Sequence, residues 1–169
     1  MNRVVIGQTT AGLAQYLLEH RSTEPGKTLR VVVGCDARTN SDIFAEDTAA
    51  IMAGYGLEAI VLPEKLPTPV LAFAVRYLNA DAGVMVTASH NPPRDNGYKV
   101  YLGGADEGSQ IIPPVDSDIE KLIAGVALSI RWADIPRSPE AVIPAPEDIV
   151  AQYVAATVAS VAPEAPHDP

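Results

Sequence analysis

The side chains best suited to chemistry lie in one segment, residues 87–99, which reads TASHNPPRDNGYK. Ser89 carries a hydroxyl that can accept a phosphoryl group, and its neighbour His90 can donate a hydrogen bond or a proton. Arg94 and Lys99 are cations that can hold the oxygens of an anionic ligand. The segment therefore combines a phosphate acceptor with phosphate-binding groups, which would suit phosphoryl chemistry.

Proline and glycine restrict the backbone of this segment. A Pro-Pro pair stiffens its middle, and Asn96–Gly97 predicts a tight turn that brings Lys99 back toward Ser89. The residues also allow a purely structural reading, in which Ser89 forms a local turn and Lys99 is solvated. Because a serine and a histidine adjacent in sequence rarely form a nucleophile and its base, spacing alone leaves both readings open.

These groups need a rigid frame, and the hydrophobic pattern predicts one in which strands and helices alternate. Strands are expected at 29–34, 57–62, 82–86 and 98–102, and helices at 2–20, 41–55, 68–78, 117–126 and 148–161. Such alternation predicts an α/β fold, a three-layer α/β/α domain with a mixed, mostly parallel sheet. The link before residue 98 is short enough for the last strand to run antiparallel.

Residues that favour helix starts set the predicted boundaries. Ser41 and Thr68 are expected as N-caps, with Pro69 at the first helical position. Ser117 and Glu120 have the spacing of a capping box, which predicts the start of a further helix.

The composition changes after Arg131, where prolines become frequent and predict a stretch without regular hydrogen bonding. We expect residues 1–130 to form one domain, and residues 131–169 to be a Pro-rich linker and helix leading toward a second domain that the chain lacks. The final APEAPHDP has too little apolar surface to order itself.

Composition excludes several classes of protein. The net charge of -9 over 169 residues argues against nucleic acid as a partner, because nucleic-acid binding normally needs a basic face. No apolar run is long enough for a membrane helix, and the start lacks the pattern of a signal peptide. A cytoplasmic protein without a membrane partner is expected. The single Cys35 cannot form an internal disulfide and is most simply a small residue at a strand end.

The serine segment resembles a known family. TASHNP followed by NGYK resembles the phosphoserine loop of the phosphohexomutases, which comprise phosphoglucomutases and phosphomannomutases. GCDART with Ser41 resembles the family's strand-end motif, and LPTPVLAF resembles its next strand-to-helix turn. The flanking MNRVVIGQTTAG and GADEGSQIIPP are most similar to the branch that includes pentose-phosphate-handling phosphoglucomutases and bacterial phosphomannomutases.

The resemblance implies roles for individual residues. Ser89 would carry a transferable phosphate, Lys99 matches the residue that shuttles the hydroxyl proton, and His90 matches a neighbour that positions the phosphate. Arg38, Asn91 and Arg94 are expected to bind substrate. For Arg38, orienting the loop and forming a surface ion pair are the alternatives.

The family also implies a metal and an activator. Mg²⁺ would contact the phosphate on Ser89, with its remaining ligands in a domain absent from this chain, and a sugar bisphosphate would act as activator. The glycine-rich arginine motif, the aspartate-rich magnesium loop, the sugar-recognition loop and the phosphate-clamping loop of the family have no counterpart here. Asp106 and Glu107 are adjacent carboxylates that do not substitute for the magnesium loop.

The resulting hypothesis is the first domain of a sugar phosphomutase, an isomerase that interconverts hexose 1-phosphate and 6-phosphate of glucose or mannose. It would act through a phosphoserine and a bisphosphorylated sugar, with the remaining mutase domains in the same or an adjacent polypeptide as partners. The isolated chain would be inactive. The alternative is a truncated, non-catalytic phosphosugar-binding or interaction module. A nucleotide-binding domain is disfavoured because no G-x-G-x-x-G or P-loop string follows a predicted strand.

Overall fold

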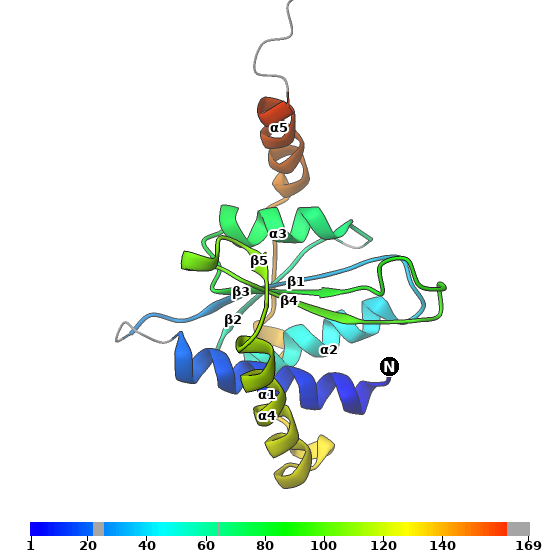
Figure 1. Cartoon of the computed structure of the whole chain (residues 1–169), viewed down its shortest axis with the longest axis vertical. Coiled ribbons are helices and arrows are strands. Elements are labelled where there is room, and N and C mark those ends of the chain that lie inside the picture. Colours follow the sequence, from blue (N-terminus) through cyan, green and yellow to red (C-terminus); the bar gives the residue numbers. More distant parts are fainter. Residues whose placement is uncertain (22–25, 64, 162–169) are drawn as a thin grey trace, which may run out of the picture.

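The computed structural model describes residues 1–21, 26–63 and 65–161. Its strands form one mixed sheet with helices on both faces (Figure 1). The strands are β1 (Arg30–Cys35), β2 (Glu58–Val61), β3 (Ala82–Val86), β4 (Tyr98–Leu102), β5 (Ser109–Gln110) and β6 (Ile143–Pro144). The α-helices are α1 (Arg3–His20), α2 (Ser41–Gly54), α3 (Thr68–Tyr77), α4 (Val115–Ser129) and α5 (Ile149–Val161), and short 3-10 helices lie at Gly104–Asp106, Trp132–Asp134 and Pro139–Ala141. The predicted α/β/α fold with a mixed sheet is confirmed.

The strand order is β5-β4-β3-β1-β2-β6, in which β1, β2, β3 and β6 run parallel. β4 returns antiparallel beside β3, as the short link between them allows, and β5 pairs antiparallel with β4. The chain leaves β1 toward β2 on one side and later returns to place β3 on the other side. In open α/β sheets, ligands bind beyond the carboxyl ends of the strands at such a reversal, which here lies between β1 and β3.

Alternate residues of the strands supply two hydrophobic cores. In β1, Val31 and Val33 face the core covered by α1 and α2, whereas Val32 faces the core covered by α3 (Figure 1). All three are fully buried, which fits a β-branched run in a strand covered on both faces. This double burial fixes the sheet from which the serine segment emerges.

The predicted helix caps are wrong by one to three positions. Asn40, with φ at 63°, is the N-cap of α2, and Ser41 is instead the first helical residue. The hydroxyl of Ser41 donates to Asp36, so a tertiary contact takes the place of capping. Likewise, α3 and α4 begin directly after prolines, so that Thr68 and Ser117 lie inside their helices.

The Pro-rich stretch forms regular hydrogen bonds, contrary to the prediction. β6 pairs with β2, and the N–H of Ala145 donates to the carbonyl oxygen of Val61 at 2.9 Å. Ile135 and Ile149 are buried in hydrophobic clusters of the domain. Proline is tolerated here because β6 is at the edge of the sheet, where one side of the strand needs no donor. The division of the chain near residue 130 stays a prediction, and the APEAPHDP segment lies outside the described residues.

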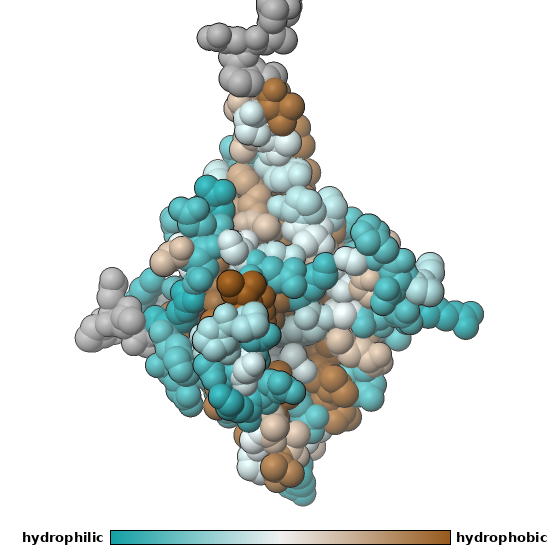
Figure 2. Space-filling model, in the orientation of Figure 1, coloured by the Kyte–Doolittle hydropathy of each residue, from teal (hydrophilic) through white to brown (hydrophobic). Residues whose placement is uncertain are grey.

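The last helix projects from the body of the molecule (Figure 1). Tyr153 of α5 packs edge-on against Phe73 of α3, with ring centroids 5.7 Å apart. Farther along, Val154 and Val158 are exposed on a helix that contains no charged residue, and Figure 2 shows hydrophobic residues on this projecting part. Within the described ranges, no helix is both long and apolar enough to cross a membrane.

The close approach of α1 to α4 at Gly12 yields a stability prediction. A Cβ added at Gly12 would lie 2.7 Å from the backbone nitrogen of Ile123, whereas one added at Gly125 on the exposed face of α4 meets nothing within 4 Å. We expect Gly12→Ala to lower the free energy of unfolding by about 1–3 kcal/mol, because the helices must move apart. Gly125→Ala should raise it by up to about 1 kcal/mol through helix propensity. Urea titration measures both, and stabilisation by both substitutions would contradict the close packing.

Candidate functional site

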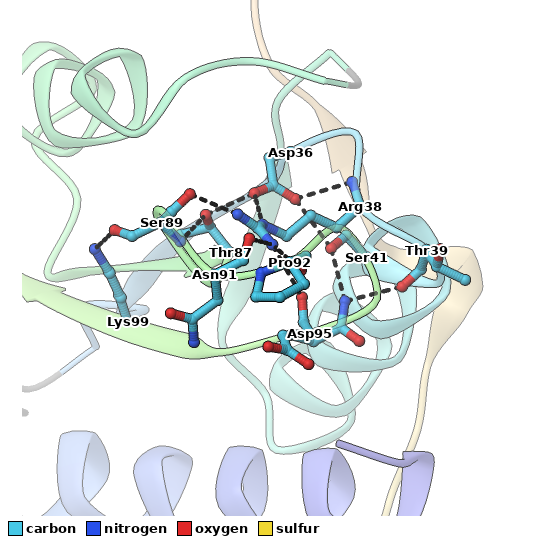
Figure 3. A network of polar contacts seen from close by, with 11 residues as sticks. Asp36, Arg38, Thr39, Ser41, Thr87, Ser89, Asn91, Pro92, Asp95 and Lys99 are labelled. Carbon is cyan, nitrogen blue, oxygen red and sulfur yellow. Dashed lines mark hydrogen bonds and ion pairs between the residues drawn. The ribbon is translucent and has the colours of Figure 1, made fainter.

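Ser89 lies just beyond β3, on the exposed loop that leads to β4 (Figure 3). The Nζ of Lys99, on β4, donates a hydrogen bond to the Oγ of Ser89 at 2.8 Å. The antiparallel return of β4 makes this contact possible, since it pairs Lys99 with Met85 near the end of β3. A serine oxygen that faces an ammonium group can carry a phosphate whose charge the ammonium offsets.

The backbone of Ser89 is held in an unusual conformation. Its φ is 54°, in the left-handed region, which costs a non-glycine residue about 1–3 kcal/mol and persists where surrounding contacts fix it. The N–H of Ser89 donates to the Oγ1 of Thr87 at 3.1 Å, and its carbonyl accepts from the Nη2 of Arg38 at 2.5 Å. Both ends of the residue are therefore tied down, and its side chain points toward Lys99 (Figure 3).

Arg38 organises the serine loop. Its side chain is 12% exposed, and its Nε donates to the carboxylate of Asp36. Its Nη1 donates to the carbonyl oxygens of Asn91 and Pro92 at 2.8 and 2.7 Å. The guanidinium thus spans the inside of the loop, which corresponds to the loop-orienting alternative raised by the sequence. A direct contact of Arg38 with substrate stays a prediction.

The carboxylate of Asp36, directly after β1, accepts four hydrogen bonds. They come from the hydroxyl of Thr87 at 2.6 Å, the hydroxyl of Ser41 at 3.1 Å, and the backbone N–H and Nε of Arg38 at 3.1 and 2.9 Å. Partial burial raises the pKa of Asp36, but these hydrogen bonds outweigh burial and hold the pKa below its ordinary value. Asp36 is therefore ionised at neutral pH.

The loop contains two tight turns, and both lie earlier than predicted. In the first, which includes Ser89, the N–H of Asn91 donates to the carbonyl oxygen of Ala88 at 3.0 Å. In the second, the N–H of Asp95 donates to the carbonyl of Pro92 at 3.0 Å, and Asn96 and Gly97 lead directly into β4. Gly97 is needed for close approach, because a Cβ there would lie 2.5 Å from the carbonyl oxygen of Thr87. The glycine thus serves packing between the two arms of the loop.

The side chain of Asn96 ties the end of the loop to the start of α2. Its Nδ2 donates to the carbonyl oxygen of Thr39 at 2.9 Å and to the Oγ of Ser41 at 3.0 Å (Figure 3). The backbone N–H of Thr39 in turn donates to the carbonyl of Pro93 at 3.3 Å. The loop is therefore braced against α2 as well as against β1.

Other predicted site residues stay outside this network. His90, Asn91 and Arg94 are exposed, and their side chains form no hydrogen bond or ion pair with another residue of the described ranges. All three belong to the loop that carries Ser89. Their roles in positioning phosphate and binding substrate stay predictions.

Sequence reasoning assigned no individual role to Asp36 or Thr87, although they lie within the motifs GCDART and TASHNP. Each directly follows a strand, and the register pairs the preceding residues, Cys35 and Val86, as neighbours. The signal in the sequence was a polar residue at each strand end. It becomes specific only when β1 and β3 are known to be adjacent.

The described residues do not form a complete magnesium site. Mg²⁺ in proteins is held by carboxylates, phosphate oxygens and water. Among the described residues, no group of three or more His, Cys, Asp or Glu side chains could hold a metal ion. Asp36 is already engaged by its four donors. Binding of Mg²⁺ through a phosphate on Ser89 stays a prediction.

An apolar groove of about 630 Å³ lies elsewhere, between α2 and the edge of the sheet at β6. Ala49, Val61 and Ile143 are among its lining residues, and its charged groups are Glu46 and Glu147. An acidic, apolar groove does not suit a phosphorylated ligand. The serine loop, with its hydroxyl and cations, is therefore the better candidate.

Comparison with known proteins finds a matching family model and similar proteins that are named as sugar phosphate mutases. Residues 1–128 match the family described as phosphoglucomutase/phosphomannomutase, alpha/beta/alpha domain I. A probable phosphomannomutase from Haemophilus influenzae is 53% identical over 164 residues, which cover 97% of this chain and 32% of that protein. A probable phosphoribomutase from Schizosaccharomyces pombe is 41% identical over 132 residues, or 78% of this chain and 22% of that protein.

The fold has a counterpart among solved structures. The crystal structure of a protein from Thermus thermophilus, assigned as a phosphomannomutase, superposes with a TM-score of 0.63 at 32% identity. The match covers 86% of this chain and 28% of that one. The chain thus spans about a third or less of the length of these relatives.

The pKa of Asp36 leads to a prediction on acid stability. Because the folded-state pKa is lowered, the ionised carboxylate stabilises the fold fully above about pH 4, and this contribution is lost as the pH falls through the folded-state pKa. We expect Asp36→Asn to lower the free energy of unfolding at neutral pH, with the deficit shrinking toward ~pH 3. Urea titrations at both pH values measure it, with Asp95→Asn on the exposed loop as the control. A deficit that is the same at both pH values would contradict the assignment.

Proposed function

Since the chain belongs to the phosphoglucomutase and phosphomannomutase family, we propose that it is the phosphate-carrying first domain of a sugar phosphomutase. Ser89 carries the transferable phosphate in this proposal. The observation that supports it most is the 2.8 Å contact between the Oγ of Ser89 and the Nζ of Lys99 at the exposed end of β3. A hydroxyl that is accessible, fixed and paired with a cation is what a phosphoryl carrier needs.

The reaction would proceed in two transfers. In the first, the bond from phosphorus to the Oγ of Ser89 breaks while a bond to a hydroxyl oxygen of the sugar phosphate forms, which gives a sugar bisphosphate and a free serine. In the second, the other phosphate of the bisphosphate moves to Ser89, and the isomeric sugar phosphate leaves. Glucose or mannose 1-phosphate and 6-phosphate are the proposed substrates, with a sugar bisphosphate as activator.

Lys99 has two tasks in this scheme. Its ammonium group, which donates to the Oγ of Ser89, offsets the negative charge that develops on that oxygen as the phosphoryl group departs. Lys99 would also give this oxygen its proton and regain one from the attacking sugar hydroxyl, so that protons balance over the transfer. His90, Asn91 and Arg94 are exposed on the same loop as Ser89 and are proposed to contact the phosphate or the sugar.

Magnesium would be shared between this chain and another domain. When bound, Mg²⁺ neutralises charge on the phosphoryl group during transfer. This chain would hold the ion through the phosphate on Ser89, and the other ligands would come from carboxylates elsewhere.

The C-terminal helix is proposed to lead into the remaining mutase domains, in the same or an adjacent polypeptide. The family match ends at residue 128, before α5 begins. The exposed Val154 and Val158 lie on a helix without charge, which suits burial in a further core. A cytoplasmic location is part of the same proposal.

Phosphorylation of one serine tests the proposal. The chain is joined to the remaining domains of the Haemophilus relative and incubated with glucose 1,6-bisphosphate and Mg²⁺. We expect one phosphoryl group, which fragment mapping by mass spectrometry places on Ser89, and none in Ser89→Ala. Ser109→Ala is the matched control and should be phosphorylated normally. Phosphate on Thr87 or Ser109 with Ser89 unmodified would overturn the proposal.

The chain on its own should fold without isomerising glucose 1-phosphate or mannose 1-phosphate at a measurable rate. Loss of one preorganised electrostatic group can cost ~10²–10³ in rate, and in this proposal the metal carboxylates and the distal phosphate clamp both belong to the other domains. A coupled assay with glucose 1,6-bisphosphate and Mg²⁺ measures it. Steady turnover that disappears in Ser89→Ala would show a self-sufficient mutase instead.

A further inference from the structure

Thr87 and Arg38 each form a hydrogen bond with the backbone of Ser89, and both also donate to the same carboxylate oxygen of Asp36. The Oγ1 of Thr87 accepts from the N–H of Ser89 and donates to the Oδ2 of Asp36 at 2.6 Å. Arg38 donates from Nη2 to the carbonyl of Ser89 and from Nε to the same Oδ2 at 2.9 Å. The peptide groups on both sides of the serine are therefore connected to one carboxylate (Figure 3).

Asp36 is itself anchored to the rigid part of the fold. Its N–H donates to the carbonyl of Val86, at the end of β3, at 3.2 Å. Its Oδ1 accepts from the hydroxyl of Ser41, the first residue of α2, and from the backbone N–H of Arg38. Asp36 is therefore held by the sheet and by α2, and its hydrogen bonds hold the exposed loop in place relative to both.

The charge of Asp36 sets the direction of the hydrogen bonds from the hydroxyls of Thr87 and Ser41. An ionised carboxylate only accepts, so the single proton of the Thr87 hydroxyl must point at Asp36. The lone pairs of that hydroxyl are then left for the N–H of Ser89. An asparagine at position 36 would place an N–H donor against one of the groups that donate to Asp36, and that hydrogen bond would be lost.

Asp36 has no lone pair left over for a ligand. A carboxylate has about four acceptor positions, and each oxygen of Asp36 already accepts two hydrogen bonds. Direct binding of substrate or metal would require part of the network to break. Asp36 is therefore placed to act on Ser89 through Thr87 and Arg38 rather than by touching a ligand.

We propose that Asp36 is a positioning residue that fixes the left-handed backbone of Ser89 through Thr87 and Arg38, and so presents the Oγ of Ser89 to Lys99. This proposal rests on the proposed role of Ser89 as the phosphate carrier. Position 89 is a serine and not a glycine, so the left-handed conformation costs free energy, and the hydrogen bonds of the network offset this cost. Displacement of a reacting group by about 1 Å can cost ~10²-fold in rate, so the network matters for transfer.

The first test needs no phosphoryl transfer. NMR spectra of the chain are recorded for Thr87→Val, which removes the hydroxyl at constant shape, and for Thr87→Ser, which keeps it. In the natural chain and Thr87→Ser, we expect a strong intraresidue NOE between the amide and α protons of Ser89, the signature of positive φ. In Thr87→Val this NOE should weaken and the amide of Ser89 should exchange about tenfold faster, the effect of one lost hydrogen bond. Thr157→Val, which removes a hydroxyl on α5, is the control and should leave Ser89 unchanged.

The second test measures phosphorylation of Ser89 in the chain joined to the domains of the Haemophilus relative. Thr87→Val should slow it about 10²-fold, whereas Thr87→Ser should stay within a few-fold of the natural rate. Asp36→Asn and Arg38→Lys should slow it as well, because a lysine cannot bridge Asp36 and the Ser89 carbonyl as a guanidinium does. These two variants carry the test if Thr87→Val does not fold.

The outcomes separate the two proposals. Variants that lower the melting temperature but leave the Ser89 NOE and the phosphorylation rate unchanged would assign Asp36 a merely structural role and overturn the inference. An unphosphorylated natural chain whose variants still show the NMR changes would refute the phosphate-carrier function while supporting the positioning role.

Discussion

The hydrogen bond of 2.6 Å between the hydroxyl of Thr87 and the carboxylate of Asp36 joins the ends of two neighbouring parallel strands. It exists because β1 and β3 end at the same level, with Cys35 paired to Val86 in the register. From this bond the network extends to the Ser89 backbone on one side and to α2 on the other. The loop is exposed to solvent, so its order depends on this connection to the buried sheet.

The position of Lys99 depends on the opposite arm of the same loop. Side chains alternate along β4, so Tyr98 and Lys99 point to opposite faces of the sheet. The hydroxyl of Tyr98 lies 3.0 Å from that of Thr10 on α1, and burial raises the pKa of Tyr98, which keeps the hydroxyl protonated. Anchoring of Tyr98 toward α1 leaves Lys99 on the other face, where it meets Ser89.

Local pattern was enough to predict the strands that frame the site. The predicted bounds of 82–86 and 98–102 agree with β3 and β4, because short apolar runs between polar loops leave little choice of length. The Ser89–Lys99 contact agrees with the predicted loop closure, although the turns of the loop lie earlier than Asn96–Gly97. The role proposed for Ser89 came from the family resemblance, since composition alone left a structural reading open.

The rest of the site depends on contacts between distant segments. Asp36 and Thr87 meet only because β3 lies beside β1, and the strand order is not encoded in either local pattern. Ser41 was predicted as a helix cap by its type, yet its hydroxyl is used by Asp36 and Asn96 instead. β6 was missed because prolines suggest a linker, whereas an edge strand tolerates them. Tertiary hydrogen bonds thus override local preference where the site is built.

A crystal structure of the chain phosphorylated on Ser89 is the most direct test of the proposal that this loop carries a phosphate. We expect oxygens of the phosphate within hydrogen-bond distance of the Nζ of Lys99, with Ser89 still at positive φ and still bound to Thr87 and Arg38. A phosphoserine in an extended conformation, turned away from Lys99 while the contacts to Asp36 stay intact, would contradict the role assigned to the loop.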